Sequence, residues 1–124
     1  MRVPPTRRQL WSLPPLYATA KIPLRNKIIR LHFTFPGDCH WYAVEFDGRD
    51  TFFGFAILHG DLANADWGYF SLGELIRLNV YGLQVVRDLH WTAKPARDVE
   101  LIAKAHPWIT GDTPCTPAPS AAIH

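Results

Sequence analysis

The 124-residue sequence predicts an α+β fold in which two or three short helices pack on an antiparallel sheet of about four to five strands. Three observations support this class. Runs of alternating apolar and polar residues are typical of half-buried strands, tight-turn signals join these runs, and a helix-capping pattern follows them. With 48% hydrophobic and 13% aromatic residues, the chain has enough apolar material for one core. We expect a single domain over 1–109, with a basic N-terminal arm at 1–30 and a disordered tail at 110–124.

The first element expected along the chain is a short helix over 6–12. Pro4 and Pro5 suit positions that precede or open a helix, because proline has a fixed φ and lacks an amide proton. For the same reasons Pro14 and Pro15 must end it.

A meander of three strands is expected next, at 27–35, 40–46 and 51–58. The turn signals between these strands are Pro36-Gly37-Asp38 and Asp47-Gly48. Such short connections make neighbouring strands antiparallel. In the middle strand, strict alternation places Trp41, Ala43 and Glu45 on one face and Tyr42, Val44 and Phe46 on the other.

The second half of the chain is expected to contribute two helices and one more strand. After the segment 67–70, Ser71 and Glu74 have the spacing of a capping box, in which each side chain bonds the backbone N–H of the other residue. A helix therefore begins here and runs to about residue 79, with four residues expected to be mostly buried: Leu72, Leu75, Ile76 and Leu78. A strand at 83–91 and a helix at 95–105 complete the predicted fold.

The net charge of +2 hides a strong asymmetry between the arm and the rest of the chain. Residues 1–30 carry seven basic side chains and no acidic one, whereas the remaining 94 residues carry six basic and eleven acidic side chains. A basic segment of this kind can steer a domain toward nucleic acid or toward an acidic protein surface. It can equally lie on the domain's own acidic surface, and the sequence leaves both interpretations open.

Cysteine content and hydropathy favour a cytoplasmic protein. The only thiols are Cys39 and Cys115, and Cys115 lies in the expected tail, so we expect no structural disulfide. Prolines interrupt the apolar stretch near the N-terminus, which argues against a signal peptide. No apolar run approaches 18 residues, so we expect no membrane span.

No sequence motif for a catalytic site or a cofactor is apparent. The chain has no Gly-x-Ser-x-Gly and no phosphate-cradling glycine motif, so we expect no catalytic residue and no cofactor. Six histidines raise the question of a metal, and His32, His40 and His90 fall on expected strands where they can converge. No His-x-x-x-His or Cys-x-x-Cys pair occurs, so we expect no metal site, and the sequence leaves this convergence open.

Two carboxylates lie in strands with apolar surroundings, Glu45 and Asp88. An unpaired carboxylate is costly there and usually finds a cation. We therefore expect each carboxylate to belong to a buried structural ion pair, with Arg30 or His40 as the cationic partner.

Aromatic side chains interleaved with basic ones are the clearest binding signal in the sequence. Such mixtures are typical of surfaces that bind proteins or single-stranded nucleic acid. The expected binding residues are Arg7, Arg8, Trp11, Tyr17, Lys21, Arg25, Arg30 and Trp41.

Several short segments of the chain form a family pattern. They are Leu13-Pro14-Pro15-Leu16-Tyr17-Ala18-Thr19, Trp41-Tyr42, Val44-Glu45-Phe46-Asp47, Phe52-Phe53-Gly54, Gly68-Tyr69-Phe70-Ser71-Leu72 with Glu74-Leu75, and Gly82-Leu83 with Arg87-Asp88-Leu89. Through them the chain resembles, from about Leu10 to Lys94, a bacterial family known as domain of unknown function 2958 (DUF2958). The family tends to show Glu directly before the Arg-Asp pair, where this chain has Val86.

The resemblance implies a setting rather than a chemistry, because the family often occurs on plasmids and other mobile elements and brings no established activity. Our leading hypothesis is a non-catalytic binding protein of mobile-element origin, an inhibitor of a host nuclease or defence complex of the anti-CRISPR or anti-restriction type. One alternative is a nucleic-acid-binding accessory domain that uses the basic arm. The other is a metal-dependent hydrolase that uses Glu45, Asp88, His40 or His90. The oligomeric state is left open.

Overall fold

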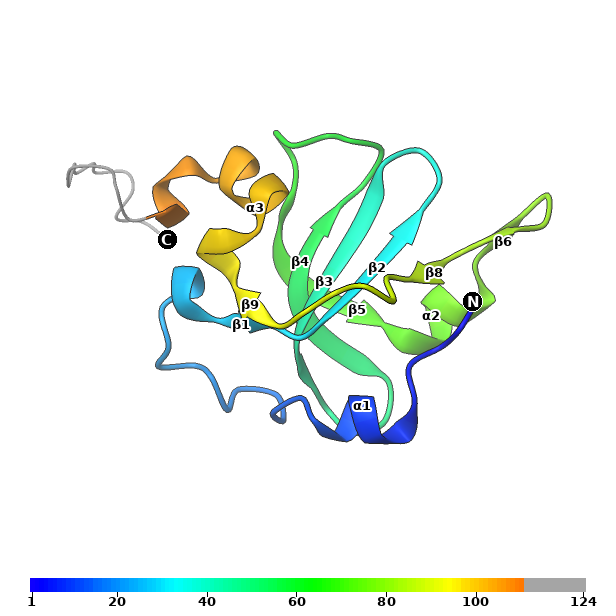
Figure 1. Cartoon of the computed structure of the whole chain (residues 1–124), viewed down its shortest axis with the longest axis horizontal. Coiled ribbons are helices and arrows are strands. Elements are labelled where there is room, and N and C mark those ends of the chain that lie inside the picture. Colours follow the sequence, from blue (N-terminus) through cyan, green and yellow to red (C-terminus); the bar gives the residue numbers. More distant parts are fainter. Residues whose placement is uncertain (111–124) are drawn as a thin grey trace.

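A computed structural model describes residues 1–110 and confirms the α+β class (Figure 1). Its main sheet has five strands in the order β5-β4-β3-β2-β8, and all neighbouring strands are antiparallel. These strands are β2 (Leu31–Phe35), β3 (Cys39–Phe46), β4 (Thr51–Ile57), β5 (Asp66–Ser71) and β8 (Val86–Arg87). Two small ladders accompany the sheet: β1 (Ile28–Ile29) with β9 (Lys94–Pro95), and β6 (Asn79–Val80) with β7 (Leu83–Gln84).

The helices of the described chain are short. The α-helices are α1 (Arg7–Trp11), α2 (Leu72–Arg77) and α3 (Glu100–Ala105), and the 3-10 helices are η1 (Leu24–Asn26), η2 (Ala96–Asp98), and η3 (Pro107–Thr110). A capping box begins α1: the Thr6 hydroxyl accepts from the Gln9 N–H at 3.1 Å, and the Gln9 side chain accepts from the Thr6 N–H at 2.8 Å.

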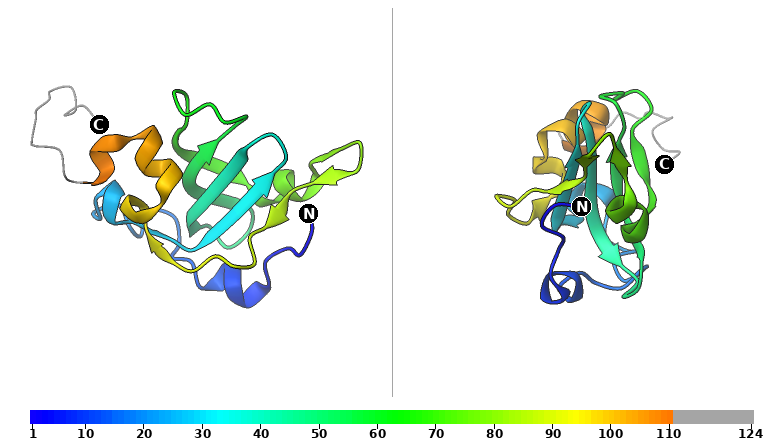
Figure 2. Two further views of the ribbon diagram at one scale, coloured as in Figure 1. Left: turned by 45° about the horizontal axis from the view of Figure 1, so that its top comes forward. Right: turned by 90° about the vertical axis from the view of Figure 1, so that its right-hand side faces the viewer.

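The sheet carries a hydrophobic core on each face. One core contains Phe33 and Phe52, and the N-terminal segment and α2 cover it. The other contains Phe55 and Ile102, and the C-terminal helices cover it (Figure 2). The first part of the N-terminal arm therefore covers one face of the sheet, whereas Leu24 and Ile29 near its end pack with the C-terminal segment on the opposite face.

A bulge in β3 changes which residues share a face. Cα pairing with β4 shifts between Ala43 and Glu45, so that Glu45 pairs with Phe53 and Phe46 pairs with Phe52. Phe46 consequently joins the core that contains Ala43, and Glu45 lies on the opposite face. Strict alternation predicts that Glu45 shares a face with Ala43 and that Phe46 lies on the other face. This prediction is wrong for both residues, because one extra residue in the strand moves the following side chains to the opposite face.

The second half of the chain departs from its predicted elements. The segment 66–71 is a full edge strand, β5, although only a lead into the helix is predicted there. The strand predicted at 83–91 breaks into β7, which pairs with β6, and β8, which pairs with β2. It ends at Arg87, and the Trp91 N–H then bonds the Asp88 carbonyl at 3.3 Å in a turn. The helix predicted at 95–105 is split into β9, η2 and α3.

The helix predicted to begin at Ser71 forms, but it is shorter and less buried than expected. It ends at Arg77, and only Leu75 of its residues is fully buried. Ile76 is 44% exposed, so its expected burial is wrong. Six residues give fewer than two full turns, which is too short for four apolar side chains to reach one core.

Thr110 ends η3, and the rest of the tail predicted at 110–124 lies outside the described residues. Over residues 1–110, no helix has the length and apolar character needed to cross a membrane.

Candidate functional site

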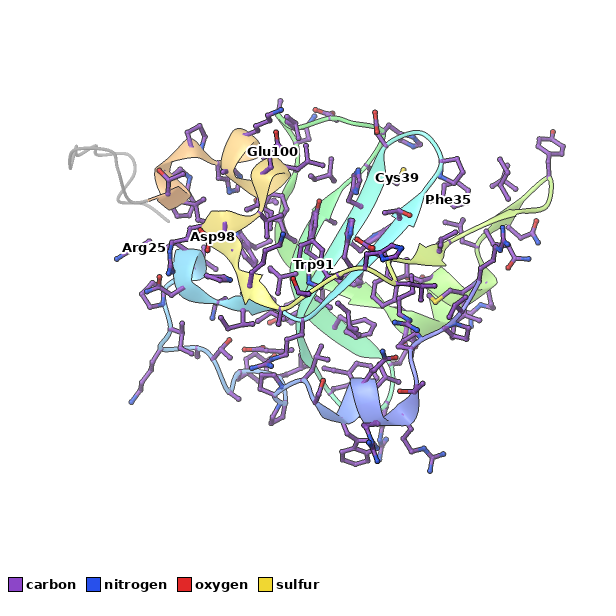
Figure 3. The ribbon with its side chains drawn as sticks, viewed as in Figure 1. Arg25, Phe35, Cys39, Trp91, Asp98 and Glu100 are labelled. Carbon is purple, nitrogen blue, oxygen red and sulfur yellow. The ribbon has the colours of Figure 1, made fainter. Side chains whose placement is uncertain are left out.

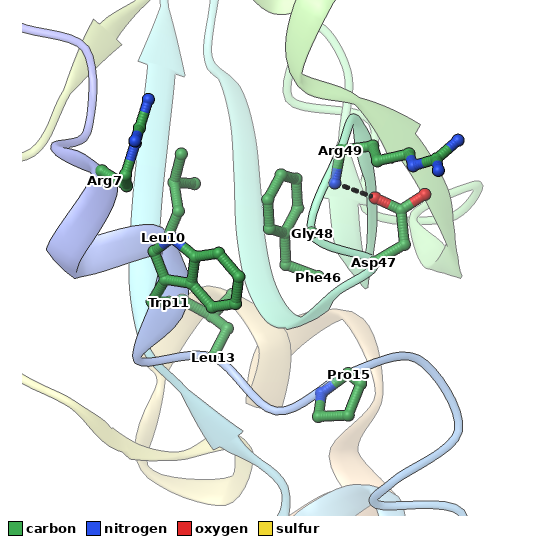
Figure 4. Close-up of a pocket in the computed structure, with 9 residues that line it drawn as sticks. All are labelled: Arg7, Leu10, Trp11, Leu13, Pro15, Phe46, Asp47, Gly48 and Arg49. Carbon is green, nitrogen blue, oxygen red and sulfur yellow. Dashed lines mark hydrogen bonds between the residues drawn. The ribbon is translucent and has the colours of Figure 1, made fainter.

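A groove of about 800 Å³ opens between α1 and the turn that joins β3 to β4 (Figure 4). Side chains from both elements line it: Arg7, Leu10, Trp11, Leu13, Pro15, Phe46, Asp47, Gly48 and Arg49. Its floor is built from the core, because Leu13 and Phe46 are buried while Leu10 packs partly against the same cluster. Trp11 stands at the mouth with 74% of its surface exposed.

The β3–β4 turn is stabilised by hydrogen bonds to its own aspartate, Asp47. Asp47 Oδ1 accepts from the backbone N–H groups of Arg49 at 2.8 Å, Asp50 at 2.8 Å and Thr51 at 3.0 Å. These backbone hydrogen bonds, that from Arg49 first, hold the pKa of Asp47 below its ordinary value. Asp47 therefore stays ionised within the turn, where its Oδ1 accepts all three bonds, and Arg7 and Arg49 are the two cationic residues among those that line the groove.

A buried carboxylate anchors the arm beside the groove. Glu45, which is 3% exposed, accepts from the Tyr17 N–H at 2.8 Å, from the Thr19 N–H at 2.9 Å and from the Thr19 hydroxyl. Lys27 completes the network by donating to the carbonyl oxygen of Thr19 and, at 2.9 Å, to its hydroxyl. Burial lowers the pKa of Lys27, and the negative charge of Glu45 opposes that shift. The cation near Glu45 is therefore Lys27, and not Arg30 or His40 as the sequence predicts.

The residues expected to bind do not form one patch. Arg7 and Trp11 line the groove, whereas other candidates are exposed outside its lining, namely Arg8, Tyr17, Lys21, Arg25 and Arg30. Figure 3 places Arg25 at the end of the molecule where the C-terminal helices lie. The prediction that Trp41 is a binding residue is wrong: its side chain is 8% exposed and packs in the core, because its position in β3 faces α2 and the N-terminal segment.

Tyr17 and Tyr69 form an exposed aromatic pair beside the arm. The hydrogen bond between their side chains raises the pKa of Tyr69. Tyr17 is 70% exposed and Tyr69 is 56% exposed, so the pair is open to solvent. Tyr17 also has a positive φ of 70°, which is an uncommon conformation for a bulky residue.

A second cluster lies on the opposite face of the sheet, where two histidines and an aspartate form a chain of hydrogen bonds. His32 Nδ1 lies 2.8 Å from Asp88 Oδ2, and His32 Nε2 lies 3.0 Å from His40 Nδ1. The His32 ring stacks on Tyr42 with centroids 4.5 Å apart. Trp91, on the segment that crosses the sheet (Figure 3), packs against both rings and donates from Nε1 to the Ile29 carbonyl at 2.9 Å.

Burial and pairing set the charges in this cluster. Burial lowers the pKa of His32 more than its hydrogen bond to Asp88 raises it, and burial also lowers the pKa of His40. For Asp88, burial acts to raise the pKa, but the hydrogen bonds from His32 and the His90 N–H outweigh it and hold that pKa below its ordinary value. The arrangement therefore favours an ionised aspartate beside two neutral imidazoles.

The structure separates the other residues of the metal hypothesis from this cluster. Asp88 pairs with His32 rather than with Arg30 or His40, and Glu45 belongs to the arm network. His90 is exposed, and only its backbone N–H reaches Asp88, at 3.0 Å. Over residues 1–110, no group of three or more histidine, cysteine, aspartate or glutamate side chains has an arrangement that holds a metal ion.

The sequence left open whether His32, His40 and His90 converge, and the structure brings His32 and His40 together without the side chain of His90. The three-residue turn between β2 and β3 sets Phe35 opposite Cys39, which places His32 opposite Tyr42. His40 then lies diagonally across from His32 on the same face, within reach of a ring-to-ring hydrogen bond.

Comparison with known proteins gives a family. No curated protein and no solved structure matches the chain. Residues 22–105 match the family model described as Protein of unknown function (DUF2958). The match includes the whole five-stranded sheet and the histidine cluster, while α1 and its side of the groove precede it. Because the match spans more than half of the sequence, the chain belongs to the DUF2958 family.

Proposed function

We propose that this chain is a cytoplasmic binding protein whose groove between α1 and the β3–β4 turn is non-catalytic and binds a partner protein. The segment that enters the groove is acidic and carries one apolar side chain as an anchor. One observation supports this proposal most directly: Trp11 is 74% exposed at the mouth of a groove that already has an apolar floor. An exposed apolar side chain that continues into an apolar groove marks an interaction site, and tryptophan is enriched among the residues that dominate protein interfaces.

The charge of the groove defines the chemistry of the partner. Arg7 lies on one wall and Arg49 on the other, and the carboxylate of Asp47 is engaged by three backbone N–H groups of its own turn. Guanidinium groups bind carboxylates in two-pronged geometry, so an acidic peptide segment is the complementary ligand. Its apolar side chain would cover Trp11 and the floor at Phe46.

For the partner itself, we take the leading hypothesis from the sequence. A protein of mobile-element origin gains from blocking a host nuclease or defence complex, and a small inhibitor needs only one complementary patch to do so. Charged residues at the rim of such an interface increase the rate of association, while buried aromatic anchors slow dissociation.

The test is a comparison of matched variants in a pull-down from host lysate, followed by mass spectrometry. Trp11→Ala and Arg7→Glu alter the groove, whereas Arg8→Glu makes the same charge change on the same helix outside its lining. We expect one stoichiometric partner that wild type and Arg8→Glu retain and that the two groove variants lose.

Nuclease treatment of the same lysate separates the proposal from nucleic-acid binding. Retention of the partner after treatment supports the protein interface. Loss of all bound material after treatment, or equal weakening by Arg7→Glu and Arg8→Glu, contradicts the groove and points to the distributed charge of the arm.

A further inference from the structure

We propose that the Asp88–His32–His40 chain is a general-base site, in which His40 Nε2 accepts a proton from water during hydrolysis of a small uncharged ester held in the hollow beside it. This site lies on the opposite face of the sheet from the groove and does not depend on the binding function proposed above.

The hydrogen-bond chain fixes the tautomer of both imidazoles. The ionised Asp88 only accepts, so His32 Nδ1 carries the proton of the 2.8 Å bond. A neutral His32 then presents Nε2 as an acceptor, and His40 Nδ1 must donate across the 3.0 Å bond between the rings. His40 Nε2 is consequently left with its lone pair, and no hydrogen bond to this atom is formed within residues 1–110.

The surroundings hold the chain rigidly. His32 stacks on Tyr42 at 4.5 Å, and Trp91 packs against His32 with centroids 5.0 Å apart. Asp88 is fixed at both oxygens, since Oδ2 bonds His32 and Oδ1 accepts from the His90 N–H at 3.0 Å. A base whose partners are already in place needs little reorganisation when it takes up a proton.

His40 opens onto a hollow of about 140 Å³, whose other lining residues are Asp38, Ile57, Gly60, Leu62 and Leu101. A water molecule takes about 30 Å³ in the liquid, so the hollow has room for one water and a small acyl group. Three of its walls are aliphatic side chains, which favour an uncharged ligand.

The chemistry is a single hydrolysis. His40 Nε2 removes a proton from water while the water oxygen forms a bond to the ester carbonyl carbon. The carbon–oxygen bond to the alcohol portion then breaks, and the leaving oxygen takes the proton back from His40, which yields a carboxylic acid and an alcohol. His40 is the catalytic residue. His32 and Asp88 act as positioning residues, because their hydrogen bonds hold His40 in the tautomer that leaves Nε2 with its lone pair.

Charged groups around the chain modulate its proton affinity. His40 is faced by His32 and by the carboxylate of Asp38, which acts to raise the pKa of His40. His32 is faced by Asp88 and by Lys94, whose positive charge acts to lower the pKa of His32. The Lys94 ammonium lies 4.5 Å from the centroid of the Trp91 ring, which keeps it over this face.

The proposal is tested with p-nitrophenyl acetate as the probe and the full chain as the catalyst. We expect His40→Gln to lower the rate above the buffer reaction at least tenfold, because a positioned general base contributes about 10²–10⁴-fold. The matched control is His90→Gln, which removes an exposed imidazole and should retain the wild-type rate. Asp88→Asn should reduce the plateau of the pH–rate profile, because the amide can donate to His32 Nδ1 and so reverse the tautomers of both imidazoles.

Three results would overturn the proposal. The first is a wild-type rate no greater than that of His40→Gln, which would show that His40 does not contribute. The second is an equal loss of rate in His90→Gln, which would assign the hydrolysis to surface imidazoles. The third comes from nitrogen NMR of unmodified protein: a neutral His40 that carries its proton on Nε2 contradicts the tautomer, whether or not the variants fold. A wild-type rate that depends on His40, with the proton on Nδ1, supports it.

Discussion

The carboxylate of Glu45 in β3 accepts a hydrogen bond from the backbone N–H of Thr19 at 2.9 Å and so ties the N-terminal arm to the sheet. The two residues are 26 positions apart in sequence. Beside this contact, the Phe46 N–H donates to the carbonyl of Pro14 at 2.9 Å, next to the groove. The position of the arm, and with it one wall of the groove, therefore depends on a buried charge.

We expect Glu45→Ala to lower the free energy of unfolding by roughly 3–5 kcal/mol, measured by urea denaturation. The substitution leaves the N–H groups of Tyr17 and Thr19 without their acceptor and Lys27 buried without its counter-charge. As the control, Glu100→Gln alters an exposed pair with Lys104 at 3.4 Å and should change stability by less than about 0.5 kcal/mol. Similar effects of the two substitutions would show that Glu45 is not an anchor.

Gly54 is expected to tolerate no side chain. A Cβ there would lie 1.8 Å from the carbonyl oxygen of Tyr42 on the neighbouring strand, and backbone cannot move aside cheaply. We predict that Gly54→Ala destabilises the protein by about 3 kcal/mol or more, or abolishes folding, in thermal and urea unfolding. Gly68 in β5 is the matched control, because a Cβ there meets nothing within 4 Å, so Gly68→Ala should cost less than about 1 kcal/mol. Equal tolerance at both sites would contradict the close strand approach.

Much of the fold was predictable because its signals are local. The capping residue Ser71 accepts from the Glu74 N–H at 3.1 Å as its spacing indicates, and the turn residues join β2, β3 and β4 into the expected meander. The bulge at Val44 was not predictable, because alternation continues through it in sequence. β5 also escaped prediction, since its aromatic residues are interrupted by Gly68 and it forms by pairing with β4.

The sites were less predictable, because they join residues that are distant in sequence. Aromatic and basic residues of the arm indicated a binding surface, but burial decides that Trp11 is exposed and Trp41 is in the core. The partner of Asp88 is His32, 56 residues away, and this pairing depends on β8 joining the edge of β2. Composition alone does not encode that register.

Asp50 should matter more than Glu74 for the start of α2. Its carboxylate accepts from the Gly73 N–H at 2.6 Å and from the Ser71 hydroxyl, and its backbone carbonyl accepts from the Leu72 N–H at 2.7 Å. We therefore predict that Asp50→Ala costs about 1–2 kcal/mol in urea unfolding, the usual range for a lost cap, whereas Glu74→Ala costs less than about 0.5 kcal/mol. A larger loss of stability in Glu74→Ala than in Asp50→Ala would indicate that the helix start is stabilised by the reciprocal capping box predicted from the sequence, in which Glu74 bonds the Ser71 N–H.

Stability should fall as the pH is lowered through the ordinary pKa of histidine, 6.5, because burial lowers the pKa of His32 and His40 in the folded state. Below that value the unfolded chain binds protons that the folded chain does not, so protonation favours unfolding. The lowered pKa of Asp88 has a separate effect: it stabilises the fold above the ordinary aspartate value of 3.8, and this contribution is lost in stronger acid.

The measurement is the free energy of unfolding in urea from about pH 8 to about pH 5, where each proton taken up on unfolding contributes a slope of at most about 1.4 kcal/mol per pH unit. His32→Gln should flatten this slope, because it removes one of the two buried imidazoles. His59→Gln replaces an exposed histidine and should keep the wild-type slope. A stability that rises on acidification, or a slope unchanged by His32→Gln, would mean that the folded state holds these imidazoles protonated, with Asp88 rather than burial controlling their charge.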